Sequence, residues 1–177
     1  MSTKEIDIII LDEIDSTNNE AQRALNYKSN FPFWIIANEQ TSGRGRKNRY
    51  WVSQKGNFMG TFVLEHKIEK QYIPHLSFVT SLALRETIEG FNKGDKEIFL
   101  KWPNDIMLSQ RKMGGILIES KSTTKGLCIV IGIGLNINES EFDIHPKIKN
   151  HSTSLSIYSG EKFITSFLYS FKFLKSK

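Results

Sequence analysis

The amino-acid sequence predicts an α+β fold in which a mixed β-sheet is flanked by helices. Short segments rich in β-branched and apolar residues follow one another with only turn residues between them, which indicates directly joined strands. Segments with helical periodicity or helix-capping residues flank these runs of strands. Because helices so seldom separate the strands, the pattern argues against a purely parallel, doubly wound sheet.

The first part of the chain contains a predicted strand–helix–strand unit. Ile6–Ile14 is apolar and β-branched, which predicts a buried strand. Asp15, Ser16 and Thr17 are helix-capping residues ahead of a run of helix formers, so a helix is expected to start there. The next expected strand, Phe33–Gln40, leads into a basic loop.

The following part contains a long helix and further strands. Apolar residues recur at three- and four-residue intervals, which predicts an amphipathic helix over His75–Phe91. The residues expected on its core-facing side are Leu76, Val79, Ala83, Thr87, Ile88 and Phe91. Strands are expected at Asn57–His66, Glu97–Trp102, Asp105–Ser109, Met113–Ser120 and Gly126–Asn138, with Ser109–Lys112 as a turn and a last helix over Gly160–Leu174.

Length and composition favour one globular domain spanning residues 1–177. Hydrophobic residues make up 39% and charged residues 24%, which suits a packed core rather than a disordered chain. The net charge of +5 favours anionic partners without choosing among them. The lone cysteine, Cys128, is expected to be a buried apolar residue, and neither a signal peptide nor a membrane span is expected, so a soluble, cytoplasmic protein is predicted.

A basic loop with two glycines runs from Thr41 to Trp51 and has the sequence TSGRGRKNRYW. Its guanidinium groups and backbone N–H groups can converge on one anion, because glycine lets the chain approach a phosphate closely. The indole of Trp51 can stack on a base or cover an apolar ligand. A solvated basic loop that touches nucleic acid explains the same composition, so the loop alone leaves both interpretations open.

Three later motifs combine polar groups with glycines or turns. KWPND is a strand end that runs into a turn, where Asn104 and Asp105 supply turn-forming side chains. RKMGGILIES places Lys112 ahead of two glycines, which suits an oxyanion or phosphate held close to the backbone. GIGLNIN places glycines in an apolar strand, where glycine is unfavourable unless something must approach the backbone.

The order of these motifs carries more information than any one of them. DSTN, QTSGRGRKNRYW, KWPND, RKMGGILIE and GIGLNIN, in that sequence, resemble the catalytic domain of the biotin protein ligases, or biotin–[acetyl-CoA-carboxylase] ligases. The resemblance extends from Ile6 to Asn138. It implies a mixed sheet with helices akin to that of class II aminoacyl-tRNA synthetases, which agrees with the strand pattern.

The resemblance implies a two-step reaction. The family activates biotin with ATP and Mg²⁺ to biotinyl-5′-AMP and releases pyrophosphate. Biotin is then transferred to a lysine of biotin carboxyl carrier protein, an acetyl-CoA carboxylase subunit. Positioning and electrostatic stabilisation drive such chemistry, so no enzyme nucleophile is required. The sequence shows no Ser/His/Asp or Cys/His arrangement that would supply one.

The resemblance also assigns roles to individual residues. Those expected to bind biotin are Ser16, Thr17, Asn18, Gln40, Arg44, Gly45, Arg46, Lys112 and Gly115. Those expected to bind ATP are Arg46, Arg49, Trp51, Asn104, Asp105, Lys112 and Asn136. The expected catalytic residues are Lys112, Arg46 and Asp105. Mg²⁺ is expected to be held mainly by the ATP phosphates, and a contact from Asp105 is left open.

Two departures from the family pattern bear on these expectations. Asn48 stands where many members carry glycine, although asparagine tolerates the left-handed geometry of a turn. The family's small C-terminal β-barrel and the N-terminal helix-turn-helix of its bifunctional members are expected to be absent. No DNA or membrane partner is therefore expected, and a homodimer is left open.

Three other functions are compatible with parts of the pattern. A lipoate-type acyl-protein ligase uses the same adenylation chemistry, although the GRGR loop favours the polar ureido head of biotin. A non-catalytic nucleic-acid-binding module would use the basic loop but gives Lys112 no role. A protein that binds biotin without catalysis is the third.

Overall fold

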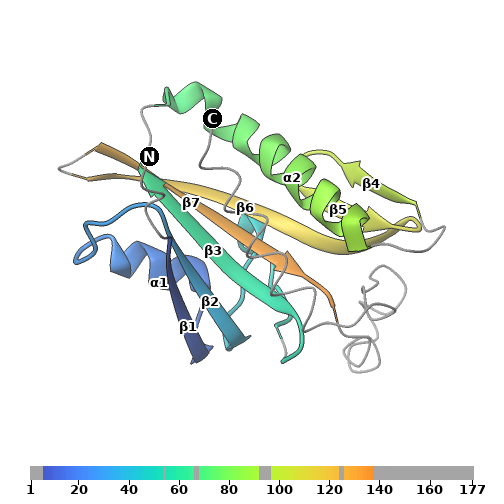
Figure 1. Ribbon diagram of the computed structural model, residues 1–177, viewed down its shortest axis with the longest axis horizontal. Helices are drawn as coiled ribbons and strands as arrows, with labels where there is room; N and C mark the ends of the chain where they lie inside the picture. The colour runs from blue at the N-terminus through green and yellow to red at the C-terminus, as the bar shows by residue number, and fades with distance from the viewer. Residues whose placement is uncertain (1–5, 54, 66–67, 92–96, 124–125, 138–177) are drawn as a thin grey trace. The chain divides into compact units, whose positions relative to one another are not determined.

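The computed structural model describes residues 6–53, 55–65, 68–91, 97–123 and 126–137 (Figure 1). The α-helices are α1 (Thr17–Ala24) and α2 (Leu76–Phe91), and short 3₁₀ turns lie at Arg46–Asn48 and Lys70–His75. The strands are β1 (Asp7–Ile14), β2 (Phe33–Gln40), β3 (Phe58–Glu65), β4 (Ile98–Lys101), β5 (Asp105–Leu108), β6 (Arg111–Thr123) and β7 (Gly126–Leu135).

The strands form a mixed sheet with the hydrogen-bonding order β1-β2-β3-β7-β6-β5-β4. β1 and β2 are parallel, whereas the β2–β3, β4–β5 and β5–β6 pairs are antiparallel. The predicted α+β class is therefore confirmed. The helix expected over Gly160–Leu174 lies outside the described residues.

The turn expected at Ser109–Lys112 is shorter than predicted. β6 begins at Arg111, so Lys112 is a strand residue and only Ser109 and Gln110 form the turn. Both turn residues have positive φ angles, 48° and 66°. This geometry is typical of a two-residue hairpin connection, whose twist matches that of the strands it joins.

The described residues divide into two compact units that interleave along the sequence. Of the described residues, the first comprises 6–53, 55, 59–65, 68–74, 117–123 and 126–133, and the second comprises 56–58, 75–91, 97–116 and 134–137. β6 and β7 contribute residues to both units. The single domain over residues 1–177 stays a prediction.

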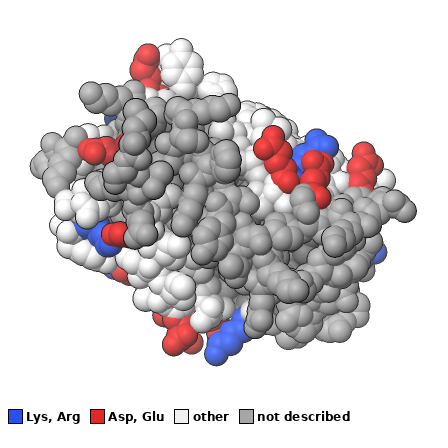
Figure 2. All heavy atoms as spheres, in the orientation of Figure 1, with Lys and Arg blue, Asp and Glu red and all other residues white. Residues whose placement is uncertain are grey.

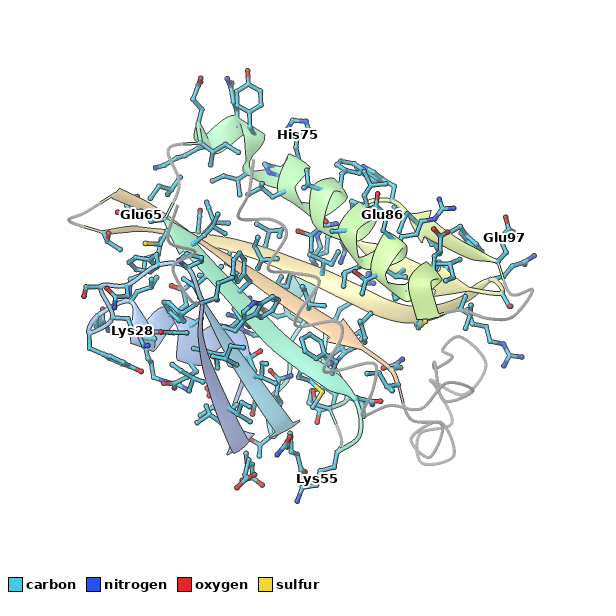
Figure 3. All side chains as sticks on the ribbon, in the orientation of Figure 1. Lys28, Lys55, Glu65, His75, Glu86 and Glu97 are labelled. Atoms are coloured by element: carbon cyan, nitrogen blue, oxygen red, sulfur yellow. The ribbon has the colours of Figure 1, made fainter. Side chains whose placement is uncertain are left out.

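In the first unit, α1 packs against β2 (Figure 1). The buried side chains of this core are Ala21, Ala24, Phe33, Ile35, Val63 and Val130. On the other face of the sheet, Trp34 and Phe62 lie directly opposite each other, with ring centroids 4.9 Å apart. Lys28 follows α1 (Figure 3), and its ammonium lies 5.4 Å from the centroid of the Phe33 ring.

The prediction that the first strand is buried is wrong, since no residue of β1 is buried and Ile9 and Leu11, which pack against the core, are only partly buried. Ile8 is 41% exposed and Ile10 is 64% exposed. Among the described strands, β1 lies at the edge of the sheet and pairs with β2 alone, so side chains on one of its faces have little to pack against. An unbroken apolar run indicates burial on both faces, but the position of a strand in the sheet decides it.

In the second unit, α2 contacts β4 and β5, but its buried face differs from the predicted one. Leu84 and Ile88 are fully buried, whereas Val79, expected in the core, is 50% exposed. Small hydroxyl side chains occupy the remaining buried positions, namely Ser77, Thr80 and Ser81. Ser81 Oγ donates to the carbonyl of Ser77 at 2.7 Å, so the helix itself satisfies a buried hydroxyl. No helix in the described ranges combines the length and apolarity needed to cross a bilayer.

Candidate functional site

The start of α1 meets the end of β2 in the first unit. The parallel β1–β2 register places Ile14 beside Gln40, so Thr17 follows shortly after this point. Gln40 Oε1 accepts hydrogen bonds from the backbone N–H of Thr17 at 2.7 Å and from Thr17 Oγ1 at 3.1 Å. Gln40 Nε2 donates to Ser53 Oγ at 2.8 Å. Thr17, Gln40 and Ser53 are all buried, so the network is shielded from water.

Asn18 is the next residue of this network, and the protein holds both ends of its amide. Thr61 Oγ1 lies 2.7 Å from Asn18 Oδ1, and Asn18 Nδ2 donates to Glu119 Oε2 at 2.8 Å. Gly132 on β7 lies against the same amide, because a Cβ at this position would be 2.1 Å from Asn18 Oδ1. The expectation that glycine in GIGLNIN permits a close approach is confirmed here: the approaching group is the side chain of Asn18.

The basic loop is an ordered hairpin. The backbone N–H of Trp51 donates to the carbonyl of Gly43 at 2.9 Å, and the N–H of Gly45 donates to the carbonyl of Arg49 at 2.8 Å. A Cβ on Gly43 would lie 2.5 Å from the carbonyl oxygen of Trp51, so only glycine fits the base of the hairpin. At the tip, Lys47 and Asn48 have φ angles of 56° and 55°.

The cations of this loop differ in their surroundings. Arg44 is partly buried and forms a bidentate ion pair with Glu119, with its Nη1 at 2.8 Å from Oε1 and its Nη2 at 2.9 Å from Oε2. Arg44 Nε also donates to Asn19 Oδ1 at 3.0 Å. The exposed cations of the loop are Arg46, Lys47 and Arg49. On the face drawn in Figure 2, the described acidic and basic side chains are interspersed.

In the second unit, a β-bulge sets the direction of Lys112. β5 and β6 pair Asp105 with Gly115 and Ile106 with Gly114, but then pair Met107 with Lys112. The extra residue turns the Lys112 side chain to the face that carries Asp105, because side chains of directly opposed residues share a face. Lys112 Nζ donates to Asp105 Oδ1 at 2.7 Å, and the two side chains are 33% and 26% exposed. Both side chains are therefore partly exposed to solvent.

Asn104 and Asn136 fix the backbone around this ion pair. Asn104 Nδ2 donates to the carbonyl of Ile116 at 2.9 Å, and the N–H of Ile116 donates back to the carbonyl of Asn104 at 3.0 Å. The buried Asn136 donates its backbone N–H to the carbonyl of Met113 at 2.8 Å. These contacts hold the KWPN turn and the bulged strand in place.

The residues predicted to form one site fall into two groups, one in each unit. The first unit holds Ser16, Thr17, Asn18, Gln40, Arg44, Gly45, Arg46, Arg49 and Trp51. The second unit holds Asn104, Asp105, Lys112, Gly115 and Asn136. Ser53, Thr61 and Glu119 join these networks without having been predicted. In the sequence, Glu119 could have been identified as a candidate because its carboxylate directly follows the apolar run GGILI.

Comparison with known proteins gives one consistent result. Residues 11–136 match the Biotin/lipoate A/B protein ligase family. The chain is 36% identical over 157 residues to the bifunctional ligase/repressor BirA of Bacillus spizizenii, covering 88% of this chain and 48% of that protein. It is 39% identical over 129 residues to the biotin–[acetyl-CoA-carboxylase] ligase of Paracoccus denitrificans, covering 72% and 53%. The chain thus spans about half the length of these curated relatives.

Solved structures with the same fold include two ligand complexes. The biotin protein ligase of Leishmania major in complex with biotinyl-5-AMP superposes with a TM-score of 0.77 at 26% identity, over 96% of this chain and 74% of that one. The biotin protein ligase of Aquifex aeolicus in complex with biotin and ATP superposes with a TM-score of 0.76 at 30% identity, over 93% and 68%.

Proposed function

The chain belongs to the Biotin/lipoate A/B protein ligase family, and from that premise we propose that it is an ATP-dependent biotin protein ligase. It forms biotinyl-5′-AMP and pyrophosphate from biotin and ATP, and then transfers biotin to a lysine of a biotin carboxyl carrier protein. The relatives named as biotin ligases and the neighbours solved with biotin, ATP or biotinyl-5-AMP support this assignment.

The observation that carries the proposal is the placement of Lys112. Attack of the biotin carboxylate on the α-phosphate brings two anions together while negative charge grows on the phosphate oxygens. An ammonium held in advance beside the reacting groups stabilises that charge without reorganisation. The bulge in β6 and the 2.7 Å contact with Asp105 hold the Lys112 ammonium in place before ligand arrives.

Asp105 has a second part in this scheme. Its carboxylate keeps the Lys112 ammonium oriented until the ligand phosphate and carboxylate replace that contact. In the transfer step the acceptor lysine loses a proton to solvent, its amine attacks the biotinyl carbonyl, and the acyl–phosphate bond breaks to release AMP. The partly exposed Asp105 carboxylate is the group in this unit proposed to orient that amine.

The first unit supports biotin as the acyl group. Thr17, Gln40 and Ser53 form a buried array of hydroxyl and amide groups, which suits the polar ureido ring better than the dithiolane of lipoate. Biotin can exchange some of these internal hydrogen bonds for bonds to its ureido group, whereas the dithiolane has no groups for that exchange and would leave displaced partners unpaired. The exposed Arg46 and Arg49 of the loop hairpin are proposed to contact the phosphates.

Mg²⁺ fits this donor set as a ligand of ATP rather than of the protein. In the described ranges, no three His, Cys, Asp or Glu side chains gather in a group that could hold a metal ion. We propose that the ion is held mainly by the ATP phosphates and that Asp105 is the carboxylate that could add a contact from the protein. When bound, Mg²⁺ supplies charge neutralisation of the phosphates.

The test is formation of an acyl-adenylate. The protein is mixed with Mg-ATP and radiolabelled biotin or lipoate, and the products are separated. Biotinyl-AMP with pyrophosphate release supports the proposal, and later addition of a carrier domain should move the label onto its lysine. A lipoyl-adenylate alone would indicate the lipoate ligase. Salt-dependent binding to DNA or RNA without any adenylate would indicate the nucleic-acid module.

A matched pair of lysine variants tests the role of Lys112. Lys112→Ala is expected to keep measurable biotin binding while adenylate formation falls roughly 10²–10³-fold, the usual loss when one preorganised charge or donor is removed. Lys55→Ala, in the exposed segment before β3, removes the same charge elsewhere and should leave the rate unchanged (Figure 3). Unchanged pyrophosphate release by Lys112→Ala contradicts the assigned role.

A further inference from the structure

Glu119 on β6 is the point where the loop and the start of α1 are joined. Its two oxygens accept two hydrogen bonds from Arg44 of the loop, at 2.8 and 2.9 Å, and one from Asn18 of α1, at 2.8 Å. The Glu119 and Arg44 side chains are each 26% exposed, so the pair is partly shielded from solvent. A bidentate arginine–carboxylate pair also fixes orientation, which a point charge does not.

The spacing of side chains on β6 matches the spacing of residues on α1. Glu119 contacts Asn18, and Lys121, two residues further along the strand, reaches the carbonyl of Gln22 at 3.3 Å. Two strand residues span about 6.6 Å and four helix residues span about 6 Å, so both contacts form together. The carboxylate lies at the N-terminal turn of the helix and the ammonium near its C-terminal turn, which suits the helix dipole.

Of these two contacts, that of Glu119 alone also extends to the loop. Lys121 contacts the helix and the Asn26 side chain that follows it, at 3.4 Å. Glu119 contacts both the helix and Arg44. Both side chains hold α1 on the sheet, but of the two only Glu119 also holds the loop. Comparing variants of the two residues therefore distinguishes an effect on α1 from an effect on the loop.

We propose that Glu119 is a positioning residue, which fixes Arg44 and the amide of Asn18 relative to each other and so sets the biotin-binding geometry of the first unit. This inference rests on the proposed function. A carboxylate is required because three donors converge on two oxygens, and the terminal NH₂ of a glutamine would face donors instead of accepting from them. Without the carboxylate, Arg44 leaves its place and the base of the loop hairpin moves with it.

The experiment compares Glu119→Gln with Lys121→Met. Biotin affinity is measured by calorimetry, and the Michaelis constants for biotin and ATP by adenylate formation. Glu119→Gln should weaken biotin binding and raise its KM by roughly ten- to hundredfold, the range expected for small misplacement of binding groups. The KM for ATP and kcat at saturating biotin should change less than about threefold. The variant loses biotin-binding energy that the ground state and the transition state share, and such a loss raises KM without lowering kcat. Lys121→Met should change none of these values by more than about threefold.

A ligand-independent measurement follows the loop itself. The exposed tip carries trypsin sites at Arg46, Lys47 and Arg49, so its cleavage rate reports how well the hairpin is held. Glu119→Gln should be cut faster than the wild type and Lys121→Met should not. Arg44→Lys, which keeps the charge but loses the bidentate fork, should behave like Glu119→Gln, and the double variant should be no worse than either single one.

The outcomes separate this inference from the proposed function. Equal biotin affinity for Glu119→Gln and the wild type, or an equal loss for Lys121→Met, overturns the positioning role. If the wild type neither binds biotin nor forms an adenylate, the proposed function fails. The trypsin comparison then decides whether Glu119 holds the loop, since unchanged cleavage in Glu119→Gln overturns that claim as well.

Discussion

Gly132→Ala is expected to destabilise the protein through one contact, that with Asn18. A Cβ on Gly132 would lie 2.1 Å from Asn18 Oδ1 and 2.9 Å from its Cγ, whereas ordinary contact begins at 3.4 Å. The amide or the strand must therefore shift by roughly 3.4 − 2.1 = 1.3 Å. A shift of this size breaks the 2.7 Å contact with Thr61 or the 2.8 Å bond to Glu119.

The magnitude follows from the number of hydrogen bonds at risk. Leaving one buried polar group unsatisfied costs about 1–3 kcal/mol, and two bonds are held by this amide. The lower backbone entropy of alanine in the unfolded chain offsets about 0.5–1 kcal/mol of this. The net destabilisation expected is about 0–2.5 kcal/mol if one bond is lost and about 1–5.5 kcal/mol if both are lost, and each kcal/mol lowers the Tm of a chain of this length by roughly 2–4 °C.

A double-mutant cycle identifies the cause. Thermal and urea unfolding are measured for the wild type, Gly132→Ala, Asn18→Ala and the double variant. In the Asn18→Ala background the obstructing amide is gone, so Gly132→Ala should cost less by about 1 kcal/mol or more. Gly45→Ala is the control, because its nearest atom would be 3.8 Å away, and it should be neutral to about 0.5 kcal/mol. Equal costs of Gly132→Ala in both backgrounds would refute the steric argument.

Three further predictions address the loop, an ion pair and the thiol. Arg46→Gly should let biotinyl-AMP escape roughly ten- to hundredfold faster, since one charge-assisted hydrogen bond contributes about 1.5–3 kcal/mol. Single-turnover assays would detect the free adenylate, and Lys55→Ala, which removes an exposed cation outside the loop, is the control. The Arg23 guanidinium holds the pKa of Asp15 well below its usual 3.8, so the stabilisation it gives is present above about pH 4 and is lost as the pH falls toward the folded pKa. Because the pair is largely exposed, Asp15→Asn should lower Tm by only about 1–4 °C at pH 7. This difference in Tm between the variant and the wild type should shrink between about pH 5 and pH 2. A difference that stays constant with pH speaks against a stabilising Asp15–Arg23 pair. Burial raises the pKa of the Cys128 thiol, so a disulfide reagent at pH 8 should react at least about a hundredfold slower with the native than with the unfolded protein.

Regular elements were predictable wherever local pattern alone determines them. β2 has the predicted bounds, Phe33–Gln40, because a continuous apolar run is flanked by turn residues on both sides. α1 begins at Thr17, where a helix start was predicted, although the side chain of Ser16 at the N-cap makes no capping hydrogen bond, and α2 begins one residue after the predicted start. Propensity acts over a few residues, so a single sequence contains the required information.

Features that depend on a partner strand were not predictable. The orientation of Lys112 depends on the β-bulge that shifts the register between Ile106 and Met107. The pattern of apolar residues within β6 does not indicate this bulge. The exposure of Ile10 depends on β1 lying at the sheet edge, and the buried hydroxyls of α2 depend on what the helix contacts. Glu119 was missed for the same reason, since its donors lie 75 and 101 residues away along the chain.

The two consecutive left-handed residues at the loop tip have a consequence for any attempt to improve this protein. Left-handed geometry costs an L-residue other than glycine about 1–2 kcal/mol, with asparagine the more tolerant of the two present. The hairpin at Lys47 and Asn48 is thus less stable than the same turn built with glycines. Selection for thermostability would favour glycine at these two positions, and slower exchange of substrate and product is the drawback such a variant should show.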